Sequence, residues 1–124
     1  EAEILSGIKV TDYETARQAA ELISARGVEN VIITLGSQGA LIKEGGDYHY
    51  VEAYTVEAVD TTAAGDSFCG SFCVGLVEDR SILDSVKLAA KAAALTVTRM
   101  GAQSSIPCRS ELSSLDVEKV NTSL

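Results

Sequence analysis

The chain has 124 residues, which is enough for one small domain with a hydrophobic core. Its formal net charge of −8 disfavours non-specific binding to nucleic acid or to an anionic membrane surface. No apolar run approaches the roughly 18 residues of a membrane span, and three cysteines leave one unpaired in any disulfide scheme. The composition therefore predicts a cytoplasmic protein that interacts with neither nucleic acid nor membrane.

The first part of the chain predicts helices followed by a buried strand. Residues 1–7 predict the end of a helix closed by a glycine. Thr11 and Glu14 form a capping-box pattern before an alanine-rich helix that Gly27 ends. Residues 30–35 form an apolar, β-branched run, as expected of a strand buried on both faces. A helix followed by such a strand predicts a layered α/β fold with a largely parallel sheet.

A Gly-Ser-Gln-Gly loop at residues 36–39 follows this strand. Ligands tend to bind at the C-terminal ends of strands in α/β folds, but this loop by itself is more simply explained as a plain turn. It matches neither a Walker A sequence nor a Gly-x-Gly-x-x-Gly fingerprint. Residues 40–43 and 48–51 then predict a hairpin around residues 45–47, with His49 as a surface strand residue.

The segment from residue 55 to residue 70 carries the clearest chemical pattern. A β-branched run at 55–59 predicts a strand that ends near Asp60, and a helix over residues 64–77 follows. The unpaired backbone N–H groups and the positive dipole end at such a helix start attract anions. Residues 63–65, Ala-Ala-Gly, have little side-chain bulk, so a ligand can approach the backbone closely.

Asp66 lies in the first turn of this predicted helix. A carboxylate at that position is most simply explained by its favourable interaction with the helix dipole. Beside an anion hole made by the N–H groups of residues 63–65, the same carboxylate could take a proton from a hydroxyl while those groups hold a phosphoryl group. The residues alone leave both interpretations open.

The rest of the helix at 64–77 and the helix that follows it are predicted to be structural scaffold. Cys69 and Cys73 are i, i+4 neighbours and are interpreted as packing residues, because no further metal ligand lies at a useful spacing. Ser81 and Asp84 predict the start of another helix, with Ser81 as its N-cap. The alanine-dense run at 88–95 allows that helix to pack closely against a neighbour or a flat ligand.

Three segments, in order along the chain, resemble motifs of the PfkB carbohydrate kinase family. The sequence Val-Asp-Thr-Thr-Ala-Ala-Gly-Asp at 59–66 resembles the family's second signature, usually Asp-Thr-x-Gly-Ala-Gly-Asp. Its alanine at position 63, where most members have glycine, is similar to the ribokinase branch. Residues 34–39 resemble the family's nucleotide loop, and residues 99–107 resemble the C-terminal segment of the ribokinase branch. The resemblance extends from Glu1 to about Glu111.

This resemblance implies a fold and a reaction. The fold is the layered α/β/α ribokinase-like fold, and residues 1–124 would be its C-terminal nucleotide-binding and catalytic part, without the N-terminal sugar-binding and lid part. The implied enzyme is a phosphotransferase with an alcohol acceptor. It would convert D-ribose and ATP to D-ribose 5-phosphate and ADP, with Mg²⁺ and with activation by K⁺. The full-length enzyme would be a homodimer, and the 124 residues alone are expected to be inactive.

The resemblance also assigns catalytic and nucleotide-binding residues. Asp66 would be the general base and would contact the sugar substrate. The anion hole would be formed by the N–H groups of Ala63, Ala64 and Gly65. The ATP-binding residues would be Thr34, Leu35, Gly36, Ser37, Gln38, Gly39, Gly65, Asp66 and Ala90. The family often has Asn or His near the last of these positions, where this chain has alanine and lysine.

Two metal sites follow from the resemblance. The K⁺ ligands, several of them through backbone carbonyls, would be Asp60, Thr62, Thr96, Arg99, Gly101 and Ser105. Glu1 would be the Glu of the family's Asn-x-x-Glu motif and would act on Mg²⁺ through water. The Asn of that motif would lie upstream of Glu1.

Two alternatives stay open at this stage. The first is another PfkB kinase, acting on deoxyribose, fructose or a nucleoside, because the sugar contacts of the family lie mostly outside the segment that these residues match. The second is a noncatalytic nucleotide-binding module that keeps the fold and has lost turnover. The intact Asp66 favours an enzyme over such a module.

Overall fold

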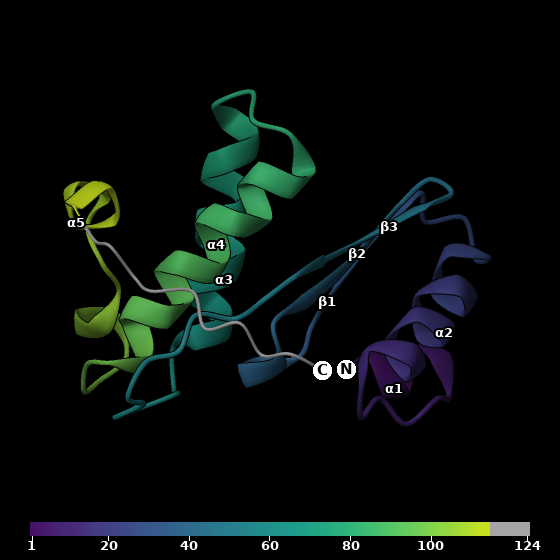
Figure 1. Ribbon diagram of the computed structural model, residues 1–124, viewed down its shortest axis with the longest axis horizontal. Coiled ribbons are helices and arrows are strands. Elements are labelled where there is room, and N and C mark those ends of the chain that lie inside the picture. Colours follow the sequence, from purple (N-terminus) through teal and green to yellow (C-terminus); the bar gives the residue numbers. More distant parts are fainter. Residues whose placement is uncertain (115–124) are drawn as a thin grey trace. The chain divides into compact units, whose positions relative to one another are not determined.

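The computed structural model describes residues 1–114 of the chain (Figure 1). The chain divides into two compact units, Glu1–Val51 and Glu52–Leu124. The first unit holds helices and a small sheet, and the second holds helices and loops. The α/β class predicted from the sequence is therefore confirmed.

Two helices open the first unit. Helix α1, Ala2–Ser6, ends at Gly7, whose φ of 77° is the left-handed conformation that glycine adopts without strain. Helix α2, Tyr13–Ser24, is amphipathic and buries three of its alanines. Both helices lie where the sequence predicts them.

The N-cap of α2 differs from the prediction by one residue. Asp12, not Thr11, caps the helix, and its carboxylate accepts a hydrogen bond from the Thr15 N–H at 2.8 Å. The Thr15 hydroxyl accepts in return from the Asp12 N–H at 3.1 Å. A charged oxygen is the stronger acceptor at a helix start, so the capping box forms with Asp12 and not with the Thr11–Glu14 pair.

In the part of the chain that the structure describes, the sheet has three strands, β1 (Asn30–Thr34), β2 (Ala40–Glu44) and β3 (Asp47–Val51), in the order β1-β2-β3. The predicted hairpin between the second and third strands is confirmed. Every described pairing is antiparallel, so the prediction of a largely parallel sheet is unconfirmed and these strands depart from it. The connections at 35–39 and 45–46 are too short for the crossover that parallel neighbours require.

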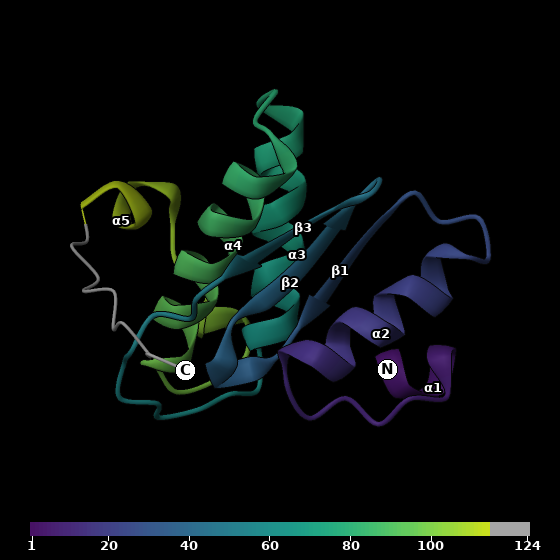
Figure 2. The same ribbon diagram turned by 45° about the vertical axis from the view of Figure 1, so that its right-hand side comes forward.

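Helix α2 covers one face of this sheet (Figures 1 and 2). The resulting core consists of six buried residues, Ala16, Ala19, Ala20, Val31, Ile33 and Leu41. Ile32, between two of the buried strand positions, is only half-buried, because successive side chains of a strand point to opposite faces. The prediction that this strand is buried on both faces is therefore wrong for β1.

The second unit is built on a pair of long helices (Figures 1 and 2). Helix α3, Ala64–Val77, has the bounds that the sequence predicts, and α4, Ile82–Val97, follows after a short turn. Gly75 permits their close contact, because a Cβ there would lie 2.6–2.9 Å from atoms of Ser85. The Ser81 hydroxyl caps α4 by accepting from the Asp84 N–H at 3.1 Å, as predicted. Helix α5, Arg109–Ser114, comes after a loop.

Two predictions about this unit are wrong. The β-branched run at 55–59 forms no strand, and the Val59 and Asp60 N–H groups donate to the Val97 carbonyl at 2.7 and 3.1 Å. Strand propensity has no effect without a strand partner, and the run meets the end of a helix instead. Cys69 and Cys73, interpreted as packing residues, are exposed, because α3 turns its stripe with Phe68 inward.

Candidate functional site

The turn that precedes α3 is fastened by the carboxylate of Asp60. One oxygen of this carboxylate accepts from the Thr62 N–H at 2.9 Å and from the Thr62 hydroxyl at 2.5 Å. The other accepts from the Gly101 N–H at 3.0 Å, which lies 41 residues away in the chain. Hydrogen bonds from the Thr62 hydroxyl, then from its N–H and from the Gly101 N–H, lower the pKa of Asp60. A charged carboxylate therefore joins the turn to the loop at 101–105.

The N-terminus of α3 is left without a side-chain cap. Ala63 is the N-cap residue and supplies no acceptor, while the Ala64 N–H makes a long bond of 3.3 Å to the Thr61 carbonyl. Among the described residues, none accepts a hydrogen bond from the N–H of Gly65 or of Asp66. A Cβ placed on Gly65 would meet nothing within 4 Å. A bound anion can reach these donors without displacing a side chain.

Asp66 differs from Asp60 in having no hydrogen-bond or ion-pair partner within residues 1–114. Its side chain is exposed in the first turn of α3, and no hydrogen bond or ion pair holds it within residues 1–114. A carboxylate in that condition keeps its lone pairs available to accept a proton from a hydroxyl group.

A buried contact holds the start of α3 against α4. The Ser67 and Thr96 hydroxyl oxygens lie 2.8 Å apart, and Thr96 Oγ1 also donates to the Ala92 carbonyl at 2.9 Å. Both side chains are almost fully buried. The Thr96 hydroxyl is thus engaged within the buried helix pair.

The loop after α4 is folded by its own hydrogen bonds. Gly101 has a φ of 101°, and a Cβ on it would lie 2.6 Å from the Ser104 hydroxyl oxygen, so glycine is required there. The buried Ser105 hydroxyl donates to the Ala102 carbonyl at 2.6 Å. Arg99 pairs with Glu111, with Nη2 and Oε1 2.5 Å apart, and this hydrogen bond raises the pKa of the guanidinium and lowers that of the carboxyl.

The structure brings together part of the predicted K⁺ ligand set. Asp60, Thr62 and Gly101 are joined by hydrogen bonds, and the Arg99 N–H donates to the Thr96 carbonyl at 3.1 Å. Within residues 1–114 no group of three His, Cys, Asp or Glu side chains is placed to hold a metal ion. A site here would therefore consist of one carboxylate and neutral oxygens, which suits a hard cation of low charge.

The predicted nucleotide loop lies in the first unit, at the end of β1. Three backbone hydrogen bonds of 2.8–3.1 Å close it, and Gly36 and Gly39 have φ values of 57° and 103°. The sequence predicts the loop but gives no sign of what anchors it. The Tyr50 hydroxyl donates to the Gln38 carbonyl, and the Gln38 side chain donates to the Thr11 carbonyl at 3.4 Å. Only the folded hairpin brings Tyr50 to this loop.

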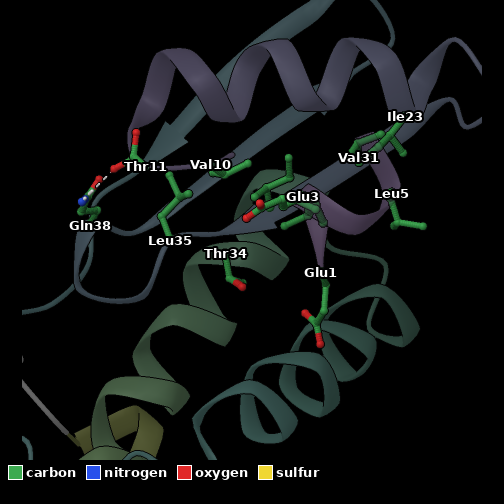
Figure 3. A pocket seen from close by; sticks show the side chains of 13 residues that line it. Glu1, Glu3, Leu5, Val10, Thr11, Ile23, Val31, Thr34, Leu35 and Gln38 are labelled. Atoms are coloured by element: carbon green, nitrogen blue, oxygen red, sulfur yellow. Dashed lines mark hydrogen bonds between the residues drawn. The ribbon is translucent and has the colours of Figure 1, made fainter. Parts of the chain in front are cut away.

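A groove in the first unit connects this loop with Glu1 (Figure 3). In Figure 3 the Gln38–Thr11 hydrogen bond lies toward one end and the Glu1 carboxylate toward the other. The groove lining includes four of the predicted site residues, Glu1, Thr34, Leu35 and Gln38. It is otherwise formed mainly by apolar side chains of α1, α2 and β1.

The predicted site residues divide between the two units. Those at positions 1 and 34–39 lie in the first unit, and those at 60–66, 90 and 96–105 lie in the second. Ala90, predicted near the nucleotide, is half-buried on α4. In the part of the chain that the structure describes, no helix is both long and apolar enough to cross a membrane.

The similarity to known proteins covers all three motif segments, at 34–39, 59–66 and 99–107. The family model described as "pfkB family carbohydrate kinase" matches residues 1–109. A ribokinase from Haemophilus influenzae is 44% identical over 111 residues, a match that covers 90% of this chain and 36% of that protein. This chain therefore spans little more than a third of the length of such relatives.

The chain is also similar to solved structures of sugar kinases. The Arabidopsis thaliana ribokinase complexed with ribose and ATP is 33% identical, with a TM-score of 0.83 over 90% of this chain and 36% of that one. A fructokinase double mutant from Vibrio cholerae O395, in a form with bound fructose, ADP and potassium ion, is 28% identical, with a TM-score of 0.81. That match covers 95% of this chain and 38% of the fructokinase.

Proposed function

The chain belongs to the pfkB family of carbohydrate kinases, and on that premise we propose that it is the nucleotide-binding and catalytic part of a ribose kinase. The reaction is transfer of the γ-phosphoryl group of ATP to the 5-hydroxyl of D-ribose, which gives D-ribose 5-phosphate and ADP. The 44% identity to a ribokinase supports ribose as the sugar. The bound ribose and ATP of the Arabidopsis thaliana relative support the two substrates.

One observation carries the proposal. The turn at 60–66 is held by Asp60, whereas the N–H groups of Gly65 and Asp66 and the carboxylate of Asp66 have no partner among the described residues. A fixed turn with unused donors and an unused base is the arrangement that phosphoryl transfer needs, because this chemistry depends mainly on positioning and charge stabilisation.

Asp66 acts as the general base in this mechanism. Its carboxylate accepts the proton of the 5-hydroxyl as the hydroxyl oxygen forms a bond to the γ-phosphorus. The bond between that phosphorus and the oxygen bridging to the β-phosphate breaks, and ADP leaves with the electron pair. The N–H groups at Ala63, Ala64 and Gly65 donate to the phosphoryl oxygens, with the long Ala64–Thr61 bond given up to do so.

Two metal ions and the nucleotide loop complete the proposed site. Residues 34–39 and Ala90 would contact ATP, and Glu1, which lines the same groove as Thr34, would act on Mg²⁺ through water. For K⁺, the oxygens of Asp60, Thr62 and the carbonyls at 96–105 form a donor set of suitable type. The potassium ion of the Vibrio cholerae relative supports such a site. When bound, Mg²⁺ neutralises phosphate charge and K⁺ orders the turn that carries Asp66.

The proposed full protein is a cytoplasmic homodimer with a layered α/β/α architecture. Within the described residues β1 is an edge strand of its sheet. In the longer protein a parallel neighbour would pair with this edge, which would produce the largely parallel sheet that the three described strands lack.

The test uses a kinase chimera, in which this chain replaces the matching 36% of the Haemophilus influenzae ribokinase. We expect ATP-dependent phosphorylation of D-ribose, measured by ADP release and by mass of the product, with lower rates on 2-deoxyribose, fructose and adenosine. A faster rate on one of those acceptors would assign that sugar or nucleoside instead. ATP binding without phosphorylation of any acceptor would favour the noncatalytic module. The 124 residues alone should show no kinase activity.

A further inference from the structure

Tyr50 connects strand β3 to the loop at residues 36–39. Its hydroxyl donates a hydrogen bond to the Gln38 carbonyl, and its ring packs edge-on against Tyr13, with centroids 5.3 Å apart and planes at 87°. The side-chain amide of Gln38 donates to the Thr11 carbonyl at 3.4 Å. Gln38 is thus held through its backbone and its side chain by groups outside the loop, and all these residues belong to the first unit.

The hydrogen bond from Tyr50 fixes the orientation of one peptide plane. The Gln38 carbonyl and the Gly39 N–H belong to the same planar peptide and point in opposite directions. With the carbonyl directed at Tyr50, the Gly39 N–H points back into the loop, where it donates to the Gly36 carbonyl at 3.1 Å. Gly39, on one side of this peptide, has a φ of 103°, and a glycine there permits more backbone conformations than any other residue, so the peptide needs an anchor to keep one orientation.

The fixed loop leaves two donors unused. Among the described residues, none accepts a hydrogen bond from the N–H of Gly36 or of Ser37. These groups are available to a nucleotide only while the rest of the loop keeps its shape. A tyrosine that orders the loop before ATP arrives would reduce the entropy lost on binding.

We propose that Tyr50 is a positioning residue for nucleotide binding, which presets the loop at 36–39 through the Gln38 carbonyl. This role rests on the proposed function above. Neither the second signature nor the loop sequence points to Tyr50, since it lies on the neighbouring hairpin strand, opposite Leu41.

The test compares Tyr50→Phe with Tyr48→Phe in the kinase chimera. Both changes remove one hydrogen-bonded hydroxyl from β3, but the Tyr48 hydroxyl donates to the Glu21 carboxylate on α2 and not to the loop. Tyr50→Phe should raise the KM and the Kd for ATP about 2- to 10-fold, the effect of one net hydrogen bond. The kcat and the KM for ribose should not change. Tyr48→Phe should leave all four constants unchanged.

Amide hydrogen exchange of both variants gives a readout that does not need ATP. Exchange at residues 36–39 should become faster in Tyr50→Phe and stay unchanged in Tyr48→Phe. Equal effects of the two variants on ATP affinity and on loop exchange would overturn the role, because they would show only a general loss of stability. Faster loop exchange with unchanged ATP affinity would also overturn it. A chimera that does not bind ATP at all would remove the proposed function, and the Tyr50 role with it.

Discussion

The two glycine-containing turns of the proposed site are stabilised in different ways. The loop at 36–39 is held from outside, by the neutral hydroxyl of Tyr50 and by a hydrogen bond to the Thr11 carbonyl. The turn at 60–66 is held by its own Asp60, which as a charged group accepts three hydrogen bonds. Neutral anchors make a loop indifferent to pH and cations, whereas a charged anchor makes a turn respond to both.

The second turn also contains two carboxylates with opposite surroundings. Asp60 accepts three hydrogen bonds, and Asp66, six residues later in the sequence, has no partner among the described residues. The first is therefore suited to holding structure and the second to accepting a proton. This division of roles is the part of the comparison that mutation can test most directly.

The largest effect is expected from Asp66→Asn in the kinase chimera. The amide keeps the shape but cannot accept the hydroxyl proton, so kcat should fall about 10²- to 10⁴-fold. ATP affinity, measured by calorimetry, should change little because the backbone N–H groups are untouched. Asp84→Asn is the matched control, since Asp84 also lies in the first turn of a helix, where it forms only a long ion pair with Lys87. A near-normal kcat for Asp66→Asn would exclude the base role.

The next largest effect concerns the helix pair beneath the second turn. Gly75→Ala should destabilise the chain by about 1–3 kcal/mol, because the added Cβ would overlap Ser85, including its backbone Cα at 2.9 Å. Gly70→Ala, on the same helix with nothing within 4 Å, should be neutral or stabilising by up to about 1 kcal/mol. Urea unfolding measures both. Faster hydrogen exchange in Gly75→Ala should include the turn at 60–66 and spare the loop at 36–39.

A smaller effect on the rate is expected from replacing K⁺ by another cation. If K⁺ orders the turn at 60–66, the kinase chimera should be several-fold faster in K⁺ than in tetramethylammonium at the same ionic strength. Asp60→Ala should abolish this difference, because it removes the carboxylate that joins Thr62 and Gly101. Tyr50→Phe should keep the difference, because its loop has neutral anchors. Equal rates of the unmodified chimera in the two salts would remove the K⁺ site from the mechanism.

The smallest expected effect is a loss of stability of the turn at 60–66 at acidic pH. The hydrogen bonds from Thr62 and Gly101 lower the pKa of Asp60 from its ordinary 3.8. The carboxylate's contribution to stability is therefore complete above pH 3.8 and is lost as the pH falls through the lower folded pKa. Arg99 and the Cys108 N–H lower the pKa of Glu111 from 4.5, so the contribution of the Arg99–Glu111 ion pair is complete above pH 4.5 and is lost as the pH falls through the lowered pKa.

NMR can compare the response to acid of the turn at 60–66, which has a charged anchor, with that of the loop at 36–39, which has neutral anchors. During acid titration the amide signal of Gly101 should shift as Asp60 is protonated, and the amide of Gly39 should not. Asp60→Asn provides the control, because it should remove the Asp60 step from the Gly101 titration. Parallel shifts of both amides would contradict the distinction between a charged and a neutral anchor.

The sequence by itself determined the local structure of the chain. Four correct predictions follow from contacts within a few residues: the bounds of α3, the Ser81 cap, the glycine end of α1 and the hairpin, predicted around residues 45–47. The motif segments at 34–39, 59–66 and 99–107 were likewise recognisable, because their chemistry depends on residue type at fixed spacing. Even so, local pattern placed the α2 cap one residue too early, since Thr11 and Asp12 are both good caps.

Only the tertiary structure decided which distant groups meet. The Asp60–Gly101 hydrogen bond spans 41 residues, the Ser67–Thr96 contact spans 29 and the Tyr50–Gln38 hydrogen bond spans 12. No sequence pattern predicts any of these three contacts. Tertiary neighbours also decided two local features. Cys69 is exposed because no other element covers it within the described residues, and residues 55–59 form no strand because no strand lies beside them there. Propensity and spacing describe what a segment can do, but burial and hydrogen bonding depend on partners that the chain brings together only on folding.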